Sequence, residues 1–206
     1  MIVADVGNRH IHIYEDGRVI HLEFDEAIEY FGSQRLFYIC VNDEINQKIK
    51  QKTFWRDISN LIHLPGEYEG MGVDRKALCL SRGDGIYLDA GSAITVDKVH
   101  RGRYIGGALF PGLYAYKKAY SFVSKRLDFD IDELEDVHID RLPKGTKNQI
   151  GYSILKPIVD MVDSLRDNLP LYITGGDGVV FTHFFQDANF SDKLIFEGIM
   201  KVFDKR

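Results

Sequence analysis

The chain contains 206 residues, 45% of them hydrophobic and 28% charged, which is the balance of a globular protein with one large domain or two smaller ones. A formal net charge of −5 without a clustered basic stretch argues against nucleic-acid binding. No apolar run is long enough to span a membrane, and the N-terminal segment MIVADV predicts a strand rather than a signal peptide.

Short strands and short helices alternate in the first part of the chain. In order, we expect a three-stranded meander over 2–24, a helix over 25–31 with Asp25 as its N-cap, a strand over 36–41 buried on both faces, a helix over 43–51, and a loop with a short strand over 54–64. The turn-rich segment LPGEYEGMG at 64–72 then links two α/β halves, which we place at 1–70 and 71–206.

The second half combines a long hairpin with longer helices. In order, we expect a helix over 76–82, a hairpin over 86–97, a helix over about 112–127, a solvated acidic loop over 128–136, a helix over 146–166 kinked at Pro157, a strand over 171–174, a helix over 179–185, a loop with a short strand over 191–195, and a helix over 197–204. The tyrosine-rich helix over 112–127 is expected to contact the core or another subunit.

One local construction occurs twice, as a strand, an Asp-x-Gly turn and a second strand. Asp5 and Gly7 occupy the same places in the first copy as Asp89 and Gly91 in the second. Each copy alone is compatible with an ordinary β-hairpin whose Asp starts the turn. Two copies indicate a duplicated fold, in which small turn residues leave backbone N–H groups open to phosphate and a carboxylate close to a cation. We therefore expect a nucleotide-binding protein.

Two further segments carry glycine next to charged residues. Gly72-Val73-Asp74-Arg75 precedes a helix, where the Asp and Arg either face a ligand or serve as a cap and a surface charge. The cluster Gly175-Gly176-Asp177-Gly178 follows a strand and opens a helix, which is a signature of nucleotide contact.

The cysteines and histidines give weaker signals. Cys40 and Cys79 lie far apart in apolar surroundings, which predicts free thiols and a reducing, cytoplasmic location. His10 and His12 alternate along a strand and so share a face, where two imidazoles can bind metal. The sequence offers no third ligand at a suitable spacing, and solvent-facing or hydrogen-bonded histidines are the favoured interpretation.

Taken together, five motifs in a fixed order over nearly the whole chain resemble the type III pantothenate kinases. The motifs are DVGN at 5–8, GVDR at 72–75, DAGSA at 89–93, GGALFPG at 106–112 and TGGD at 174–177. The resemblance implies an actin-like, Hsp70-like (ribonuclease H-like) α/β fold of two duplicated halves with the active site at their interface. It also implies ATP-dependent phosphorylation of pantothenate to 4'-phosphopantothenate, the first step of coenzyme A synthesis, by a homodimer that uses Mg²⁺ and a monovalent cation such as K⁺ or NH₄⁺.

The resemblance also implies a role for each matching residue. Asp74 is the expected general base toward the pantothenate hydroxyl, and Arg75 the residue that holds pantothenate. The remaining pantothenate contacts are Tyr68, Gly72, Val73, Asn8 and Thr146, the last from the neighbouring protomer. The ATP contacts are Asp5, Val6, Gly7, Asn8, Arg9, Gly91, Ser92, Gly175 and Gly176. Asp5 also acts on Mg²⁺ through the phosphates, Asp89 on the monovalent cation, Gly106 and Gly107 shape the substrate pocket, and Asp177 lies at the nucleoside.

The chain departs from the family pattern at a few positions. Arg9 replaces a usual Thr or Ser, and Ser92 replaces a usual Thr while keeping the hydroxyl. Gln149 and Ser153 replace Ala and Gly after Thr146, and the segment before Gly72 is shortened. These changes alter details of the pocket and keep all three expected functional carboxylates, Asp5, Asp74 and Asp89.

Three other functions compete with this one. A non-catalytic, nucleotide-binding accessory or regulatory factor of the same fold is the main alternative, and such a factor would be expected to lack one of the three carboxylates. A sugar or acetate kinase of the same fold would normally be much larger than 206 residues. A Rossmann dehydrogenase is disfavoured because no G-x-G-x-x-G follows the first strand.

Overall fold

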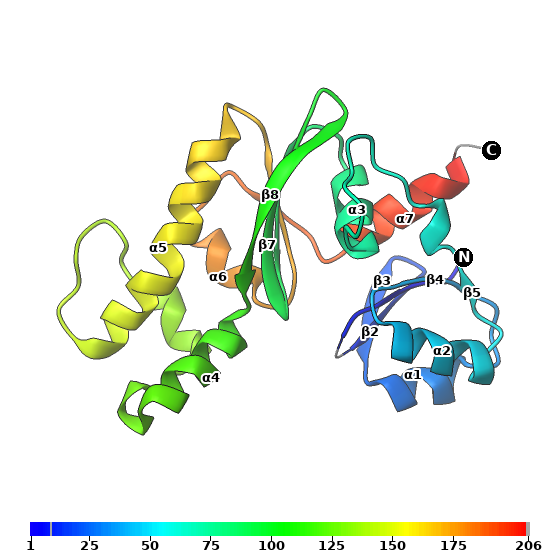
Figure 1. Cartoon of the computed structure of the whole chain (residues 1–206), viewed down its shortest axis with the longest axis horizontal. Coiled ribbons are helices and arrows are strands. Elements are labelled where there is room, and N and C mark those ends of the chain that lie inside the picture. Colours follow the sequence, from blue (N-terminus) through cyan, green and yellow to red (C-terminus); the bar gives the residue numbers. More distant parts are fainter. Residues whose placement is uncertain (9, 205–206) are drawn as a thin grey trace. The chain divides into compact units, whose positions relative to one another are not determined.

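Two compact units make up the protein, for which a computed structural model describes residues 1–8 and 10–204 (Figure 1). Among the described residues, the first unit consists of those within Met1–Gly83, Val99–Ile105 and Asp192–Arg206, and the second of those within Asp84–Lys98 and Gly106–Ser191. The C-terminal helix thus belongs to the same unit as the N-terminal strands. These two units are defined by which residues pack together in the structure. The two halves predicted above, 1–70 and 71–206, were defined by the duplicated sequence motif, and that division remains a prediction.

A five-stranded mixed sheet forms the centre of the first unit, in the order β3-β2-β1-β4-β5. Its strands are β1 (Val3–Val6), β2 (Ile11–Glu15), β3 (Arg18–Leu22), β4 (Phe37–Cys40) and β5 (Arg56–Asp57). β1, β2 and β3 pair antiparallel, while β1, β4 and β5 pair parallel. The predicted meander and the strand buried on both faces are confirmed, because Tyr38 and Ile39 of β4 are both fully buried in different apolar clusters.

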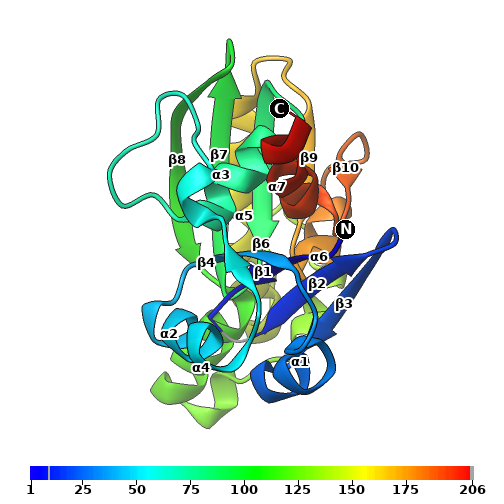
Figure 2. The same ribbon diagram turned by 90° about the vertical axis from the view of Figure 1, so that its right-hand side faces the viewer.

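Helices cover both faces of this sheet. One face carries α1 (Phe24–Phe31) and α2 (Asp43–Lys52), and the other packs against α3 (Val73–Leu80) and α7 (Leu194–Asp204), which lie side by side in both views (Figures 1 and 2). A short 3₁₀ helix, η1 (Ser59–Leu61), follows β5. The prediction of Asp25 as N-cap is wrong: Glu23 takes that place, in a reciprocal capping box with Glu26, so Asp25 lies in the first turn.

The second unit repeats the strand order of the first. Its sheet runs β10-β9-β6-β7-β8, with β6 (Gly85–Ala90), β7 (Ala93–His100), β8 (Arg103–Pro111), β9 (Leu171–Thr174) and β10 (Asn189–Phe190). From β8 inward, the order is third, second, first, fourth and fifth strand, as in the first sheet, and β6, β9 and β10 are parallel. Asp5 and Asp89 therefore lie on equivalent central strands. The predicted fold class of two duplicated α/β halves is confirmed.

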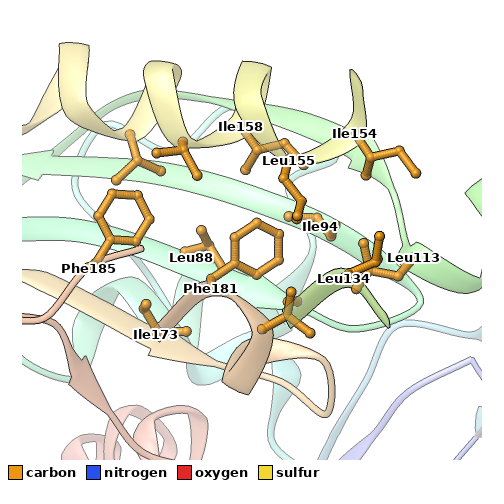
Figure 3. Close-up of a cluster of buried hydrophobic side chains, with 14 of the residues drawn as sticks. Leu88, Ile94, Leu113, Leu134, Ile154, Leu155, Ile158, Ile173, Phe181 and Phe185 are labelled. Atoms are coloured by element: carbon orange, nitrogen blue, oxygen red, sulfur yellow. The ribbon is translucent and has the colours of Figure 1, made fainter. Parts of the chain in front are cut away.

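The helices of this unit enclose its apolar core. They are α4 (Leu113–Val123), α5 (Thr146–Arg166) and α6 (Gly178–Thr182), with 3₁₀ segments η2 (Lys125–Leu127) and η3 (Ile131–Asp136). Figure 3 shows α5 lying over the sheet, with Ile154 and Ile158 above Leu88 and Ile94, and Phe181 of α6 beside them. The 3.6-residue period of α5 predicted this buried stripe, and the helix continues through Pro157.

Three element predictions need correction. The acidic segment 128–136 is not simply a solvated loop, because Phe129 and Leu134 are buried in the core and η3 forms around the latter. The short strand near the C-terminus is β10 at Asn189–Phe190 rather than within 191–195, because it pairs in parallel with β9. Helix α3 begins at Val73, so Asp74 and Arg75 lie inside its first turn.

Two properties expected from composition can be compared with the structure. Cys79 is buried and Cys40 is half-buried, and both are free thiols. Within the residues that the structure describes, none of the helices has the length and apolar character needed to cross a bilayer.

His12 makes the stability of the first unit sensitive to acid. Burial, together with the neighbouring His21 and His10, lowers the pKa of His12 from 6.5 to about 4. His12 lies on β2, directly opposite Asp5 of β1. The unfolded chain therefore takes up this proton as the pH falls below about 6.5, whereas the folded chain resists until about 4. We expect the free energy of unfolding to fall by roughly 3 kcal/mol or less between pH 7 and pH 4 through this group.

Urea unfolding at several pH values measures this effect, with His12→Gln as the comparison. The variant should lose less stability over the same pH range than the wild-type chain. Equal slopes for the two proteins would contradict the assignment of this acid sensitivity to His12.

Candidate active site

The first Asp-x-Gly loop begins at the carboxyl end of β1. Asp5 is buried near the end of this strand, Val6 is buried in the core beside it, and the Gly7 N–H donates to the carbonyl of His10 at 3.1 Å. The Asn42 side-chain amide donates to Asn8 Oδ1 at 3.3 Å, which joins the exposed loop to the start of α2. Arg9, the remaining predicted phosphate contact here, lies outside the described residues. The loop thus combines a buried carboxylate with a short turn at a strand end.

The second Asp-x-Gly loop meets the TGGD segment. Asp89 lies next to the last residue of β6 and directly opposite Thr174 of the parallel strand β9. The Gly91 N–H donates to the Ala93 carbonyl at 3.0 Å, and Ser92 is exposed in the turn. Ligands in open α/β sheets bind outside the carboxyl ends of parallel strands, where these residues lie.

Gly175 allows the TGGD segment to pack closely against the end of β6. Its φ is +91°, a conformation that favours glycine, and a Cβ there would lie 2.4 Å from the Ala90 carbonyl oxygen and 2.6 Å from Asp89 Oδ1. The Asp177 N–H donates to the same Ala90 carbonyl at 2.9 Å. A Cβ on the next residue, Gly176, would meet no atom within 4 Å, so this glycine borders open space. The structure therefore brings Gly175 against Asp89, a contact between the two motifs that the sequence did not predict.

Asp177 is the N-cap residue of α6, beside this loop. Burial raises the pKa of the Asp177 carboxyl. A half-buried carboxyl of this kind is a candidate hydrogen-bonding group for a polar ligand.

The GVDR motif forms the first turn of α3. Gly72 is the N-cap residue, and Asp74 Oδ1 accepts a hydrogen bond from the Arg75 backbone N–H at 2.7 Å. A Cβ on Gly72 would lie 2.5 Å from that oxygen, so the glycine leaves room for the carboxylate. Val73 packs against the apolar cluster beneath the helix. Gly72 rather than Asp74 is therefore the N-cap residue of α3, and the Asp74 carboxylate lies within the first turn, where it accepts this hydrogen bond.

Two tyrosines hold the Arg75 guanidinium. Its Nη1 donates to the Tyr68 hydroxyl at 2.8 Å and its Nη2 to the Tyr104 hydroxyl at 3.2 Å. The two rings lie 6.1 Å apart between centroids, and the Arg75 Cζ lies 6.0 Å from the centre of the Tyr68 ring. The structure thus places Tyr68 against Arg75, and the contact of both residues with pantothenate remains a prediction. The sequence analysis missed Tyr104, although its position two residues before Gly106-Gly107 was a signal.

Hydrogen bonds and an ion pair hold the turn-rich segment 64–72, which precedes α3. The Tyr104 N–H donates to the Pro65 carbonyl at 2.8 Å, and Lys76 Nζ lies 3.0 Å from Glu67 Oε1. Burial opposes ionisation of Glu67, but the Leu64 N–H and the Lys76 ammonium outweigh it and lower the pKa of this carboxyl. Tyr68 is thereby held on a segment fixed at both sides.

The other predicted pocket residues lie in the second unit. Gly106 and Gly107 are on β8, the former with φ +152°, and Thr146 is exposed as the first residue of α5. No group of three or more His, Cys, Asp and Glu residues in residues 1–8 and 10–204 has metal-binding geometry. The carboxylates of Asp5 and Asp89 nevertheless fit hard cations, because Mg²⁺ is commonly bound by one or two carboxylates together with substrate phosphates.

Known proteins resemble the chain over its whole length. A family model described as type III pantothenate kinase matches residues 43–168. The Helicobacter hepaticus type III pantothenate kinase is 34% identical over 207 residues, covering 100% of both chains. The Campylobacter jejuni enzyme of the same name is 33% identical over 98% of this chain and 96% of the relative. A solved C. jejuni structure, named after the Baf family of transcriptional activators, has a TM-score of 0.88 at 32% identity, covering 100% of this chain and 98% of that one.

Proposed function

The chain belongs to the type III pantothenate kinases, and we propose that its own residues divide the transfer of phosphate from ATP to pantothenate between two Asp-x-Gly loops and the first turn of α3. The protein is a kinase of pantothenate that uses ATP. The observation that supports this proposal best is the first turn of α3. There the Asp74 carboxylate is next to Arg75, whose guanidinium donates to the hydroxyls of Tyr68 and Tyr104.

Asp74 is the general base in this proposal. Phosphoryl transfer needs little covalent help from the protein, so a carboxylate that orients the attacking hydroxyl and accepts its proton is sufficient. Asp74 Oδ1 accepts the Arg75 N–H, and in this proposal the Asp74 carboxylate also accepts the proton of the pantothenate hydroxyl. Arg75 and Tyr68 hold pantothenate, with Gly72, Val73 and Asn8 lining the same substrate.

The two Asp-x-Gly loops contact ATP. Asn8 and Ser92 supply backbone and side-chain donors to its phosphates, and Val6, Gly7, Arg9 and Gly91 line the phosphates beside them. Gly175 and Gly176, with Asp177, take the nucleoside side, where Gly176 borders open space. Mg²⁺ bound with the phosphates would neutralise the charge that develops in the reaction, with Asp5 as its protein contact. Asp89 is the proposed contact of a monovalent cation, K⁺ or NH₄⁺, which would add positive charge beside the second loop.

ADP release measures the proposed reaction. The chain is supplied with ATP, Mg²⁺ and K⁺, with and without pantothenate, and the product is identified by mass. Pantothenate-dependent ADP release with formation of phosphopantothenate is the expected result, and omission of K⁺ should lower the rate. Saturable ATP binding without turnover would contradict the proposal.

A regulatory function is the second candidate. It is favoured by one observation, the name of the C. jejuni structural relative, which refers to transcriptional activators. The chain keeps Asp5, Asp74 and Asp89, whereas a non-catalytic factor would be expected to lack one of them, and this favours catalysis. The ADP-release experiment separates the two candidates, because a regulator of this fold binds nucleotide without consuming pantothenate.

Tyr104→Phe is expected to weaken pantothenate binding more than catalysis. The variant removes one of the two phenol oxygens that hold the Arg75 guanidinium, while the ring and the Tyr104 N–H bond to Pro65 remain. Loss of one such hydrogen bond is worth roughly 1 kcal/mol, which corresponds to an increase of about fivefold in KM for pantothenate. Steady-state kinetics check this, and an unchanged KM with a lowered kcat would contradict a role through Arg75.

A homodimer is part of the proposal. Exposed apolar side chains lie on β8 and α4, among them Leu109, Val123 and Phe122, of which the last is 93% exposed. Large apolar groups at high exposure mark surfaces that another protein covers, and symmetric dimers are the commonest solution. In such a dimer Thr146 of one protomer reaches pantothenate of the other. The free thiols of Cys40 and Cys79 support the accompanying proposal of a reducing, cytoplasmic location.

Light scattering tests the dimer. We expect the wild-type chain to have twice its 23.6 kDa mass, and Phe122→Asp to shift it toward the monomer because a charge would be buried in the contact. A wild-type monomer with full activity would exclude a Thr146 contribution across an interface.

A further inference from the structure

Three histidines lie on one face of the β2–β3 hairpin. His12 of β2 is the direct cross-strand partner of His21 of β3, and His10 precedes β2 on the same face. The opposite face of β2 is apolar, with Ile11 and Ile13 buried in the core. Side chains that pair directly across antiparallel strands come within reach of each other.

The two paired imidazoles turn the same atom toward each other. His12 Nδ1 and His21 Nδ1 are 2.6 Å apart, and the rings are edge-on with centroids separated by 4.7 Å. Two N–H groups cannot point at each other at this distance, so at least one nitrogen presents its lone pair to the other. Such a pair either shares one proton or, once that proton leaves, directs two lone pairs at one point.

We propose that His12 and His21 form a two-histidine site for a borderline divalent transition-metal ion, Cu²⁺ most strongly and Zn²⁺ or Ni²⁺ less so. Imidazole nitrogen suits these ions, and Cu²⁺ leads their order of affinity. Two cis nitrogens about 2.0 Å from a square-planar Cu²⁺ are about 2.8 Å apart, and two nitrogens about 2.0–2.1 Å from a tetrahedral Zn²⁺ are about 3.3 Å apart, so the pair must open by about 0.2 Å for Cu²⁺ and about 0.7 Å for Zn²⁺. His21 is exposed and lies on the edge strand of its sheet, so its side chain can make this movement.

Water completes the coordination shell in this proposal. The described part of the chain has no group of three potential ligand residues in metal-binding geometry, so the site has two protein ligands. His10 is the nearest further imidazole, with its ring centroid 6.2 Å from that of His12, but its Nε2 lies 3.1 Å from Glu23 Oε1. The cross-strand pair is therefore the chelating unit, and His10 is a neighbour held by Glu23.

The strand register places the His12–His21 pair next to the first Asp-x-Gly loop. Asp5 lies directly opposite His12 on β1, so Asp5, His12 and His21 form one row across three strands. The His10 carbonyl also accepts the Gly7 N–H, which connects the start of the hairpin to the same loop. A divalent charge bound at His12 would therefore lie beside the carboxylate assigned to ATP. This consequence for activity rests on the proposed function, whereas metal binding itself does not.

Metal binding is tested on the full chain without ATP or pantothenate. Cu²⁺ is titrated at neutral pH and followed by calorimetry and by electron paramagnetic resonance, which reports nitrogen ligands. One equivalent of Cu²⁺ with two coordinated nitrogens is expected. His21→Asn should weaken the binding about tenfold or more, because chelation by two imidazoles is lost. His138→Asn, at an exposed histidine of the other unit, is the matched control and should bind as the wild type does.

Three outcomes would overturn the proposal. Binding that survives in His21→Asn and is lost in His10→Asn would place the ion on the His10–His12 pair. Binding unaffected by either change would place the ion elsewhere on the chain. No binding at micromolar Cu²⁺ to a chain that is folded by circular dichroism would exclude the site. None of these results depends on kinase activity, so they are distinguishable from failure of the proposed function.

Discussion

Asp74→Asn is expected to lower kcat by about 10²–10⁴-fold, the usual contribution of a general base, and to leave ATP affinity nearly unchanged. The amide keeps an oxygen that can accept the Arg75 N–H, so the first turn of α3 should be preserved. It cannot accept the proton of the pantothenate hydroxyl. Steady-state kinetics with calorimetric measurement of ATP binding separates the two effects.

The structural alternative for Asp74 has a different signature. If this carboxylate served only the first turn of α3, the variant would show a lowered melting temperature with kcat close to wild type. An equal loss of turnover and ATP affinity would also remove Asp74 from the base role, because it would indicate damage to the nucleotide site. Circular dichroism on the same samples controls for folding.

Gly175→Ala is expected to have the second large effect, on both stability and nucleotide binding. The added Cβ would lie 2.4 Å from the Ala90 carbonyl oxygen, and the backbone at φ +91° disfavours any residue with a Cβ. Strain of this kind costs about 1–3 kcal/mol before the clash is relieved. The clash can be relieved only if the loop that contains Gly175 moves away from Asp89. We therefore expect the ATP affinity to fall together with the melting temperature.

Gly176→Ala is the matched control for the stability effect. It adds the same methyl group one residue later, where no atom lies within 4 Å, so its melting temperature should stay close to wild type. A nucleotide contact at Gly176 would still show as a loss of ATP affinity without a loss of stability. Equal destabilisation by both changes would show that the space around Gly175 is not the determining factor.

Local patterns predicted most elements of the fold. The predicted meander over 2–24 includes β2 and β3, and the long apolar stripe predicted α5 with its observed ends, Thr146 and Arg166. These patterns succeed because strand and helix periods are properties of the backbone, and burial of one face is sufficient to reveal them. The predictions failed where a longer-range contact decided the outcome. The pairing of β10 with β9 and the burial of Phe129 and Leu134 are contacts of this kind.

The candidate site divides in the same way. The sequence determined the two Asp-x-Gly loops, the GVDR motif and the family, because each is carried by residues that are neighbours along the chain. Only the tertiary structure brought Gly175 to Asp89, placed Tyr104 on Arg75 and paired His12 with His21. These residues are separated by 86, 29 and 9 positions, and their contacts depend on strand order and register, which are decided by packing of the whole sheet and not by any local pattern.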